Sequence, residues 1–151
     1  MGRTLKQKVN ALPTVDKHAI PKRWHKMRAQ KESRHEHTVW KRNPIKIVET
    51  PMAVRVFKQL NDRLRSRMFR RLGEEVVFNP KKLVTYQPVI SASAVLEFGN
   101  DEALANEKKA YVLGTEYGPT IWNGNHRAVA ALLTKRSFKA IYLDLVGSKK
   151  R

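Results

Sequence analysis

The longest amphipathic pattern in the chain lies between Thr50 and Gly73. Apolar residues recur there at spacings of three and four, which is the period of one helix face. Thr50 and Pro51 favour a helix start, and Gly73 favours a helix end. The pattern therefore predicts one continuous helix over residues 51–72. Its predicted buried stripe is Ala53, Val56, Phe57, Leu60, Leu64, Met68 and Leu72.

The rest of the chain alternates between short apolar runs and turn residues, which is typical of a small domain with both strands and helices. Apolar runs of strand length lie at residues 44–48, 76–78, 82–86, 111–113, 119–122 and 138–146. Ser91 is a favourable N-cap for a short helix, and Gly99 favours its end. The predicted fold class is α+β, with a small mixed sheet, flanking helices and a basic helical N-terminal region.

A strand, a glycine turn and a helix start follow one another around residue 124. Gly124 lets the backbone turn sharply, and helical spacing of alanine and leucine predicts that a helix begins at about Asn125. The first turn of a helix presents unpaired N–H groups and a partial positive charge, which together favour an anion. His126 and Arg127 add two donors. The pattern predicts a phosphate site at these four residues.

Charge narrows the class of partner. The chain carries 31 Lys and Arg against 13 Asp and Glu, a formal net charge of +18 at pH 7, and residues 1–75 hold 20 of the basic and 7 of the acidic ones. Such an excess favours a polyanion, and nucleic acid is the first candidate, with an acidic protein or a membrane surface as alternatives. In the predicted helix only Asp62 interrupts the basic residues. Those expected to contact phosphates are Arg55, Lys58, Arg63, Arg67, Arg70 and Arg71.

Residues 1–42 show no sustained period apart from a candidate helix at residues 22–30. This part of the chain is predicted to be an extended or partly helical basic arm that orders on a partner. Trp24 and Trp40 stand among Lys and Arg, so they either stack on bases or pack back onto the domain. The predicted division is an arm with its helix at 1–75, a domain at 76–147 and a basic tail at 148–151.

The chain contains no cysteine, which excludes disulfides, thiolate metal sites and thiol nucleophiles. Residues 1–12 hold no apolar run of signal-peptide length, and no later stretch approaches the roughly 20 apolar residues that span a bilayer. The expectation is a soluble, cytoplasmic protein with no membrane partner.

Two stretches resemble sequence boxes of the ParB/sulfiredoxin superfamily. Residues 83–88 resemble the first box, in which tyrosine, glutamine, proline and arginine follow the first strand. Residues 123–127, with two alanines at 130–131, resemble the glycine-glutamate-arginine-arginine box of ParB partition proteins. They also resemble the glycine-cysteine-histidine-arginine turn of sulfiredoxins. The resemblance covers about residues 76–146.

The resemblance implies an α+β fold of ParB/sulfiredoxin type whose second box grips nucleotide phosphates. Partition proteins of this type bind CTP and sulfiredoxins use ATP, so the implied cofactor is CTP or ATP with Mg²⁺. Carried over by position, the nucleotide-binding residues are Gln87, Gly124, Asn125, His126 and Arg127. Asn125 stands where sulfiredoxin has its reactive cysteine, which excludes that chemistry.

Two classes of function remain open. The first is a binding protein in which a ParB-like domain takes a nucleotide and the basic N-terminal half holds nucleic acid, with DNA expected before RNA. The second is a ParB-like nuclease, NTPase or phosphoryl-transfer enzyme, in which His126 would act as a general base. In that second class a donor role for His126 toward phosphate is the simpler alternative.

Overall fold

The computed structural model describes residues 2–20, 39–103 and 109–147. The predicted helix at residues 22–30, Trp24 and the tail at 148–151 lie outside this part. The helices are α1 (Leu5–Ala11), α3 (Met52–Gln59), α4 (Asp62–Leu72), α5 (Ala92–Asn100) and α7 (Asn125–Leu133), with 3-10 turns η1 (Lys17–Ala19) and η3 (Pro80–Lys82). The strands are β1 (Thr14–Val15), β2 (Trp40–Arg42), β3 (Lys46–Ile47), β4 (Glu74–Phe78), β5 (Val84–Thr85), β6 (Val89–Ser91), β7 (Tyr111–Thr115), β8 (Gly118–Asn123) and β9 (Phe138–Asp144).

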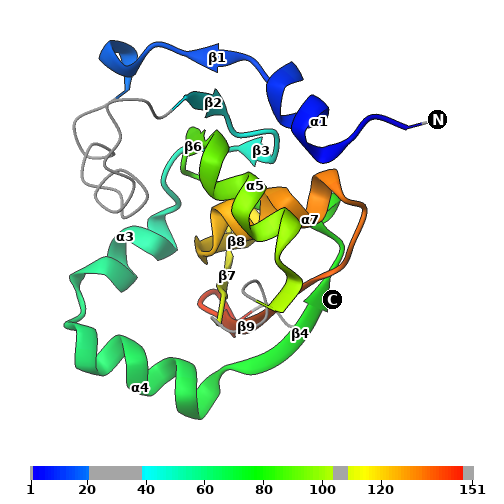
Figure 1. Ribbon diagram of the computed structural model, residues 1–151. Helices are drawn as coiled ribbons and strands as arrows, with labels where there is room; N and C mark the ends of the chain where they lie inside the picture. The colour runs from blue at the N-terminus through cyan, green and yellow to red at the C-terminus, as the bar shows by residue number, and fades with distance from the viewer. Residues whose placement is uncertain (1, 21–38, 104–108, 148–151) are drawn as a thin grey trace.

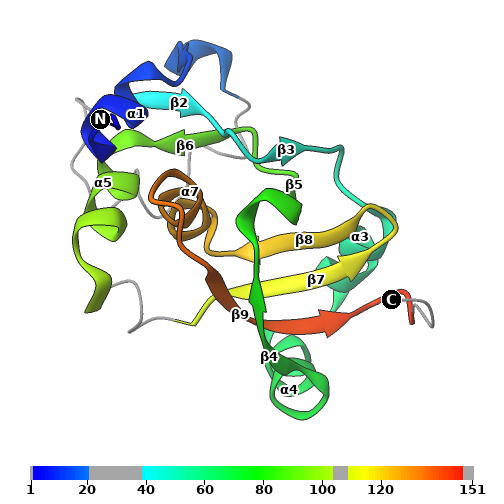
Figure 2. The same ribbon diagram turned by 90° about the vertical axis from the view of Figure 1, so that its right-hand side faces the viewer.

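The strands form two sheets, shown in Figures 1 and 2. The larger is six-stranded, in the order β3-β5-β8-β7-β9-β4, and it is mixed because β7 runs antiparallel to β8 but parallel to β9. The smaller is antiparallel, in the order β1-β2-β6. Five helices and two sheets in the described residues confirm the predicted α+β class.

Strands predicted in the second half of the chain match β4, β7, β8 and β9. The apolar run at residues 76–78 suggests a strand with both faces covered, but β4 lies at the sheet edge, paired only with β9 among the described strands, and Val77 is 63% exposed. The short helix after Ser91 is confirmed as α5, with the Ser91 side chain accepting from the Ala94 N–H at 3.4 Å.

Alternation along the central strands gives the large sheet two apolar faces, since successive strand side chains point to opposite sides. Val112 and Ile121 belong to one core, with residues of α5 and α7. Leu113 and Leu143 belong to the other, with Val54, Phe57 and Phe69 of α3 and α4. The sheet is therefore covered by α5 and α7 on one face and by α3 and α4 on the other (Figure 1).

The N-terminal residues are part of the fold over the described residues 2–20 and 39–42. Val9 of α1 is fully buried in the same core as the α5 and α7 residues, and β1 and β2 extend β6 into a sheet. The buried Lys41 ammonium donates to Asn10 O, Leu12 O and Thr14 Oγ1 at 2.8 to 3.1 Å. The expectation of an arm that orders only on a partner is wrong for these residues.

The single helix predicted at residues 51–72 is in fact two, α3 and α4, separated at Leu60 and Asn61. Asn61 is the N-cap of α4, since its side chain accepts from the Leu64 N–H at 2.8 Å. The break shifts the buried face, so Val54, Phe57 and Phe69 are buried while Val56, Leu64 and Leu72 of the predicted stripe are exposed.

The start of α3 is capped from another part of the chain. Pro51 precedes the helix without a side-chain cap, and Glu116, in the β7–β8 turn, accepts from Met52 N at 2.5 Å and Ala53 N at 3.3 Å. Hydrogen bonds to backbone N–H groups and the nearby Arg55 charge lower the pKa of Glu116 below its usual value. The carboxylate complements the positive end of the helix dipole.

Among the described residues, none of the helices has the length and apolar content that crossing a bilayer requires.

Candidate nucleic-acid interface

The glycine turn has the backbone that the sequence predicts. Gly124 has φ +114° and precedes the first residue of α7, so the expected strand, turn and helix start are confirmed. A Cβ at this position would lie 2.8 Å from Ala110 Cβ and 3.5 Å from the Phe138 ring. Glycine is therefore required by its left-handed backbone and by close packing inside the protein, and the missing side chain does not open a space for phosphate.

Asn125 is the centre of a buried polar network. Its Oδ1 accepts from Thr85 Oγ1 at 2.6 Å and from Asn43 Nδ2 at 3.2 Å, and its Nδ2 donates to Gln87 Oε1 at 3.4 Å. Gln87 also donates through Nε2 to Val89 O at 2.9 Å. The structure brings Gln87 and Asn125 together as expected, but their polar groups bind one another and the backbone.

His126 is turned toward β6. Its Nε2 accepts from the Ser91 N–H at 2.9 Å, which places the ring proton on Nδ1 and requires a neutral imidazole. Burial lowers the pKa of His126 to about 4. In this geometry the ring neither adds a positive charge nor offers Nε2 as a base at neutral pH. The expectations of a cationic phosphate donor and of a catalytic base are wrong for the conformation described.

Arg127 extends toward a different element. Its guanidinium carbon lies 6.0 Å from the centre of the Phe138 ring, and the side chain lines a cavity of about 760 Å³ with Arg136, Lys139 and Glu102. His126 and Arg127 therefore diverge, the first toward β6 and the second toward β9. The predicted convergence of both side chains on one anion pocket is wrong.

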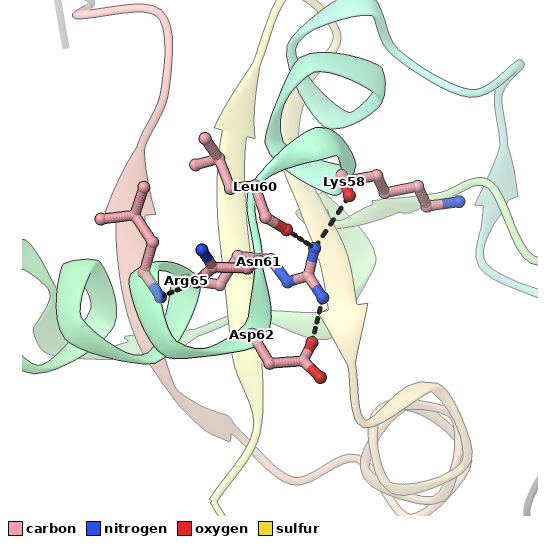
Figure 3. Close-up of polar contacts among 6 residues, drawn as sticks. Lys58, Leu60, Asn61, Asp62 and Arg65 are labelled. Carbon is pink, nitrogen blue, oxygen red and sulfur yellow. Dashed lines mark hydrogen bonds and ion pairs between the residues drawn. The ribbon is translucent and has the colours of Figure 1, made fainter.

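The connection between α3 and α4 is held by Arg65 (Figure 3). Its guanidinium donates to Lys58 O at 2.9 Å, to Leu60 O and to the Asp62 carboxylate. Lys58 O lies in the last turn of α3 and Leu60 O directly follows the helix, where carbonyls lack partners within the helix. Arg65 thus serves the fold, and it also pairs with Asp62, the one carboxylate within α3 and α4.

Four other arginines of α4 form what we call the α4 arginine row: Arg63, Arg67, Arg70 and Arg71. Spacings of four and three place them along one side of the helix, and all four are exposed. In the part of the chain that the structure describes, no carboxylate lies within ion-pair distance of them. The row is an exposed cationic strip that no acid of the described fold compensates.

The two predicted cations of α3 have local contacts. The Lys58 ammonium lies 4.8 Å from the centre of the Tyr86 ring, and Arg55 lies close enough to Glu116 to influence its pKa. Both are exposed. They add to the positive charge on this side of the molecule, although they are less available to a ligand than the row.

The two tryptophans of the N-terminal segment differ in where they lie. Trp40 is only 5% exposed and packs with Ile20 and Val89, which is the alternative in which it packs back onto the domain. It cannot stack on a base in this position, so its assignment to the interface is wrong. Trp24 lies outside the described residues.

Sequence reasoning missed a groove beside the row, lined by Tyr111, Trp122 and Asn123 among others. The alternation in β7 and β8 was the available signal, because it places Tyr111 and Trp122 on the face that the amphipathic helices cover.

Among the described residues, no group of three or more His, Asp or Glu is arranged to hold a metal ion.

Comparisons with protein-family models, with curated proteins and with solved structures found no match to this chain. The resemblance of residues 83–88 and 123–127 to ParB/sulfiredoxin boxes stays a prediction.

Proposed function

We propose that the protein binds nucleic acid through the sugar-phosphate backbone, with the α4 arginine row as the contact. The observation that carries this proposal is the placement of four exposed, uncompensated guanidinium groups along one side of one helix in the described fold. Guanidinium groups pair with phosphate through two parallel hydrogen bonds, and a line of them matches a line of phosphates.

The energetics of α4 support the same assignment. Like charges three or four residues apart destabilise a helix by roughly 0.2–0.5 kcal/mol per pair. Arg70 and Arg71 offset part of this cost, because cations are favourable near the negative end of a helix. Arg63 and Arg67 have no such compensation, and a bound polyanion would remove the repulsion among all four.

A nucleotide at residues 124–127 is not part of this proposal. The side chains of Asn125 and His126 there are bound to other groups of the chain.

The test changes all four row residues to glutamine in the full chain. Glutamine is about as good a helix former as arginine, so α4 is expected to remain folded. Fluorescence anisotropy at several salt concentrations measures binding to a labelled duplex of roughly 20 base pairs. Near 100 mM salt the variant should bind the duplex at least about tenfold more weakly than the unaltered chain. The slope of log K against log salt should flatten by up to about 3.6, close to 0.9 for each phosphate that the variant no longer neutralises.

The matched control removes the same charge elsewhere, at Arg3, Lys6, Lys81 and Lys82, which are also exposed. It has the same net charge as the row variant. If both variants lose affinity and salt dependence equally, net charge alone drives binding and the row is not the contact.

A further inference from the structure

A groove of about 510 Å³ lies between α4 and the large sheet. It exists because Phe69 is the one buried side chain of α4, so the helix rests on the sheet mainly at that point. Around this contact the groove is lined by Tyr111, Trp122 and Asn123 from β7 and β8, and by Arg65 and Arg70 from α4. Its volume is within the range of small-ligand sites, roughly 300–1,000 Å³.

The aromatic wall of the groove is fixed before any ligand arrives. Trp122 packs perpendicular to Phe57, with ring centres 5.1 Å apart, and the Arg65 guanidinium lies 5.9 Å from its ring centre. The Tyr111 ring packs against the Phe69 ring, with the two ring centres 4.5 Å apart. Aromatic rings and guanidinium planes are the surfaces on which unpaired bases stack, and fixed surfaces lose little entropy on binding.

The groove is continuous with the α4 arginine row, because Arg70 belongs to both. Asn123 is exposed at the end of β8 and presents an amide, which can donate to and accept from a base edge. The groove lining thus combines the planar Trp122 ring, the Asn123 amide and the Arg70 cation, which is also part of the α4 arginine row. This combination matches one nucleotide unit: a base, its edge and its phosphate.

We infer that the groove takes an unpaired base of a single strand whose phosphates lie along the α4 arginine row. The bases of a duplex are stacked and paired, so only an unpaired nucleotide can enter. This inference rests on the proposed function and adds to it the class of nucleic acid: single-stranded regions in preference to duplex.

The test compares a labelled oligo(dT) of roughly 20 nucleotides with a duplex of equal length, at the same salt, for the full chain and two groove variants. Trp122→Leu keeps an apolar contact for Phe57 but removes the ring. It should weaken binding to oligo(dT) by about 5- to 160-fold, the range for loss of one stacked base, with duplex affinity changed by less than about twofold.

Asn123→Ala is the second variant, because an exposed side chain can be removed without risk to the fold. It should weaken binding to oligo(dT) by about threefold to tenfold. Asn100→Ala, an exposed asparagine of α5 outside the groove, is its matched control and should have no effect. Unchanged oligo(dT) affinity in Asn123→Ala, together with equal losses for strand and duplex in Trp122→Leu, would overturn the inference.

Photo-crosslinking of the unaltered chain to oligonucleotide containing 5-bromodeoxyuridine gives an independent readout. Crosslinks at Tyr111 or Trp122 are expected, and crosslinks found only elsewhere would contradict the inference. Free dTMP should displace oligo(dT) only at millimolar concentration or above; displacement at micromolar dTMP would mean that the site takes a free nucleotide and would overturn the strand assignment.

The row variant separates this inference from the proposed function. If the row variant loses affinity for both strand and duplex while the groove variants behave like the unaltered chain, the proposed function holds and the inference fails. If the unaltered chain binds neither, both fail.

Discussion

The side chain of Asn125 joins three segments that are distant in sequence. It contacts Asn43 before β3, Thr85 in β5 and Gln87 after it. Each contact satisfies a polar group that is buried or nearly so, and leaving such a group without a partner costs about 1–3 kcal/mol. The residue therefore links the start of α7 to the segment before β3 and to the end of β5.

Asn125→Ala should lower the free energy of unfolding by about 2–4 kcal/mol, because Thr85, Asn43 and Gln87 lose their shared partner. Urea unfolding followed by circular dichroism measures this. Asn123→Ala, two residues earlier and exposed, is the control and should change stability by less than about 0.5 kcal/mol. Equal effects of the two substitutions would mean that Asn125 does not hold these segments.

His126 makes stability depend on pH. Its pKa is lowered to about 4 in the folded chain from an ordinary value of 6.5, so the unfolded chain binds the proton more tightly. The stabilisation by neutral His126 is complete above pH 6.5 and is lost as the pH falls from about 6.5 to about 4, by roughly 3 kcal/mol in all.

His126→Gln tests this, since its amide oxygen can still accept from Ser91 N but does not titrate. Unfolding free energies measured between about pH 7.5 and about pH 4 should fall more steeply for the unaltered chain than for the variant. Parallel pH profiles would show that His126 titrates in the folded chain much as it does in the unfolded one.

The helix pair α3 and α4 depends on Arg65 for its angle, because one guanidinium joins the end of the first helix to the start of the second. Arg65→Ala should destabilise the protein by about 1–3 kcal/mol and speed hydrogen exchange in α4. Arg67→Ala removes the same side chain from an exposed position of the same helix. A similar loss of stability in both variants would contradict the structural role of Arg65.

The break between these helices was foreseeable in part. Asn61 and Asp62 form a good N-cap and first turn, but the apolar spacing of three and four continues through Leu60 and Leu64 and hides the interruption. By contrast, β8, the turn at Gly124 and the start of α7 were predicted correctly, because backbone conformation there is set by local residues.

The directions of the His126 and Arg127 side chains could not be predicted from local sequence. They are set by Ser91 and Phe138, which belong to other elements of the fold. A helix start next to a glycine turn indicates backbone N–H groups, but tertiary partners decide where the following side chains point. The arginine row was predictable because charged side chains at helical spacing are expected on the solvent side of an amphipathic helix.

In the molecule as a whole, helix α1 of the basic N-terminal segment shares a core with the domain. Val9 lies in α1, which sequence reasoning assigned to a separate arm, yet it packs with α5 and α7 residues and has no exposed surface. A few scattered apolar residues among lysines do not reveal such packing, because no period in this stretch marks a face.

Val9→Ala should therefore lower the free energy of unfolding by about 1.5–3 kcal/mol, from reduced burial and the cavity left behind. Lys6→Ala, exposed in the same helix, is the control, with an expected change below about 0.5 kcal/mol. If the segment ordered only on a partner, Val9→Ala would not alter the stability of the free protein.

Nucleic acid is proposed to lie on α4 and not at the glycine turn, and the other functional predictions depend on this placement. The most direct test is an NMR titration of the ¹⁵N-labelled full chain with oligo(dT), which maps the perturbed amides without any substitution. We predict that residues 62–72 and the groove residues 122–123 show the largest shifts and that residues 126–128 stay unchanged. Large shifts at residues 126–128 with α4 unperturbed would contradict this placement.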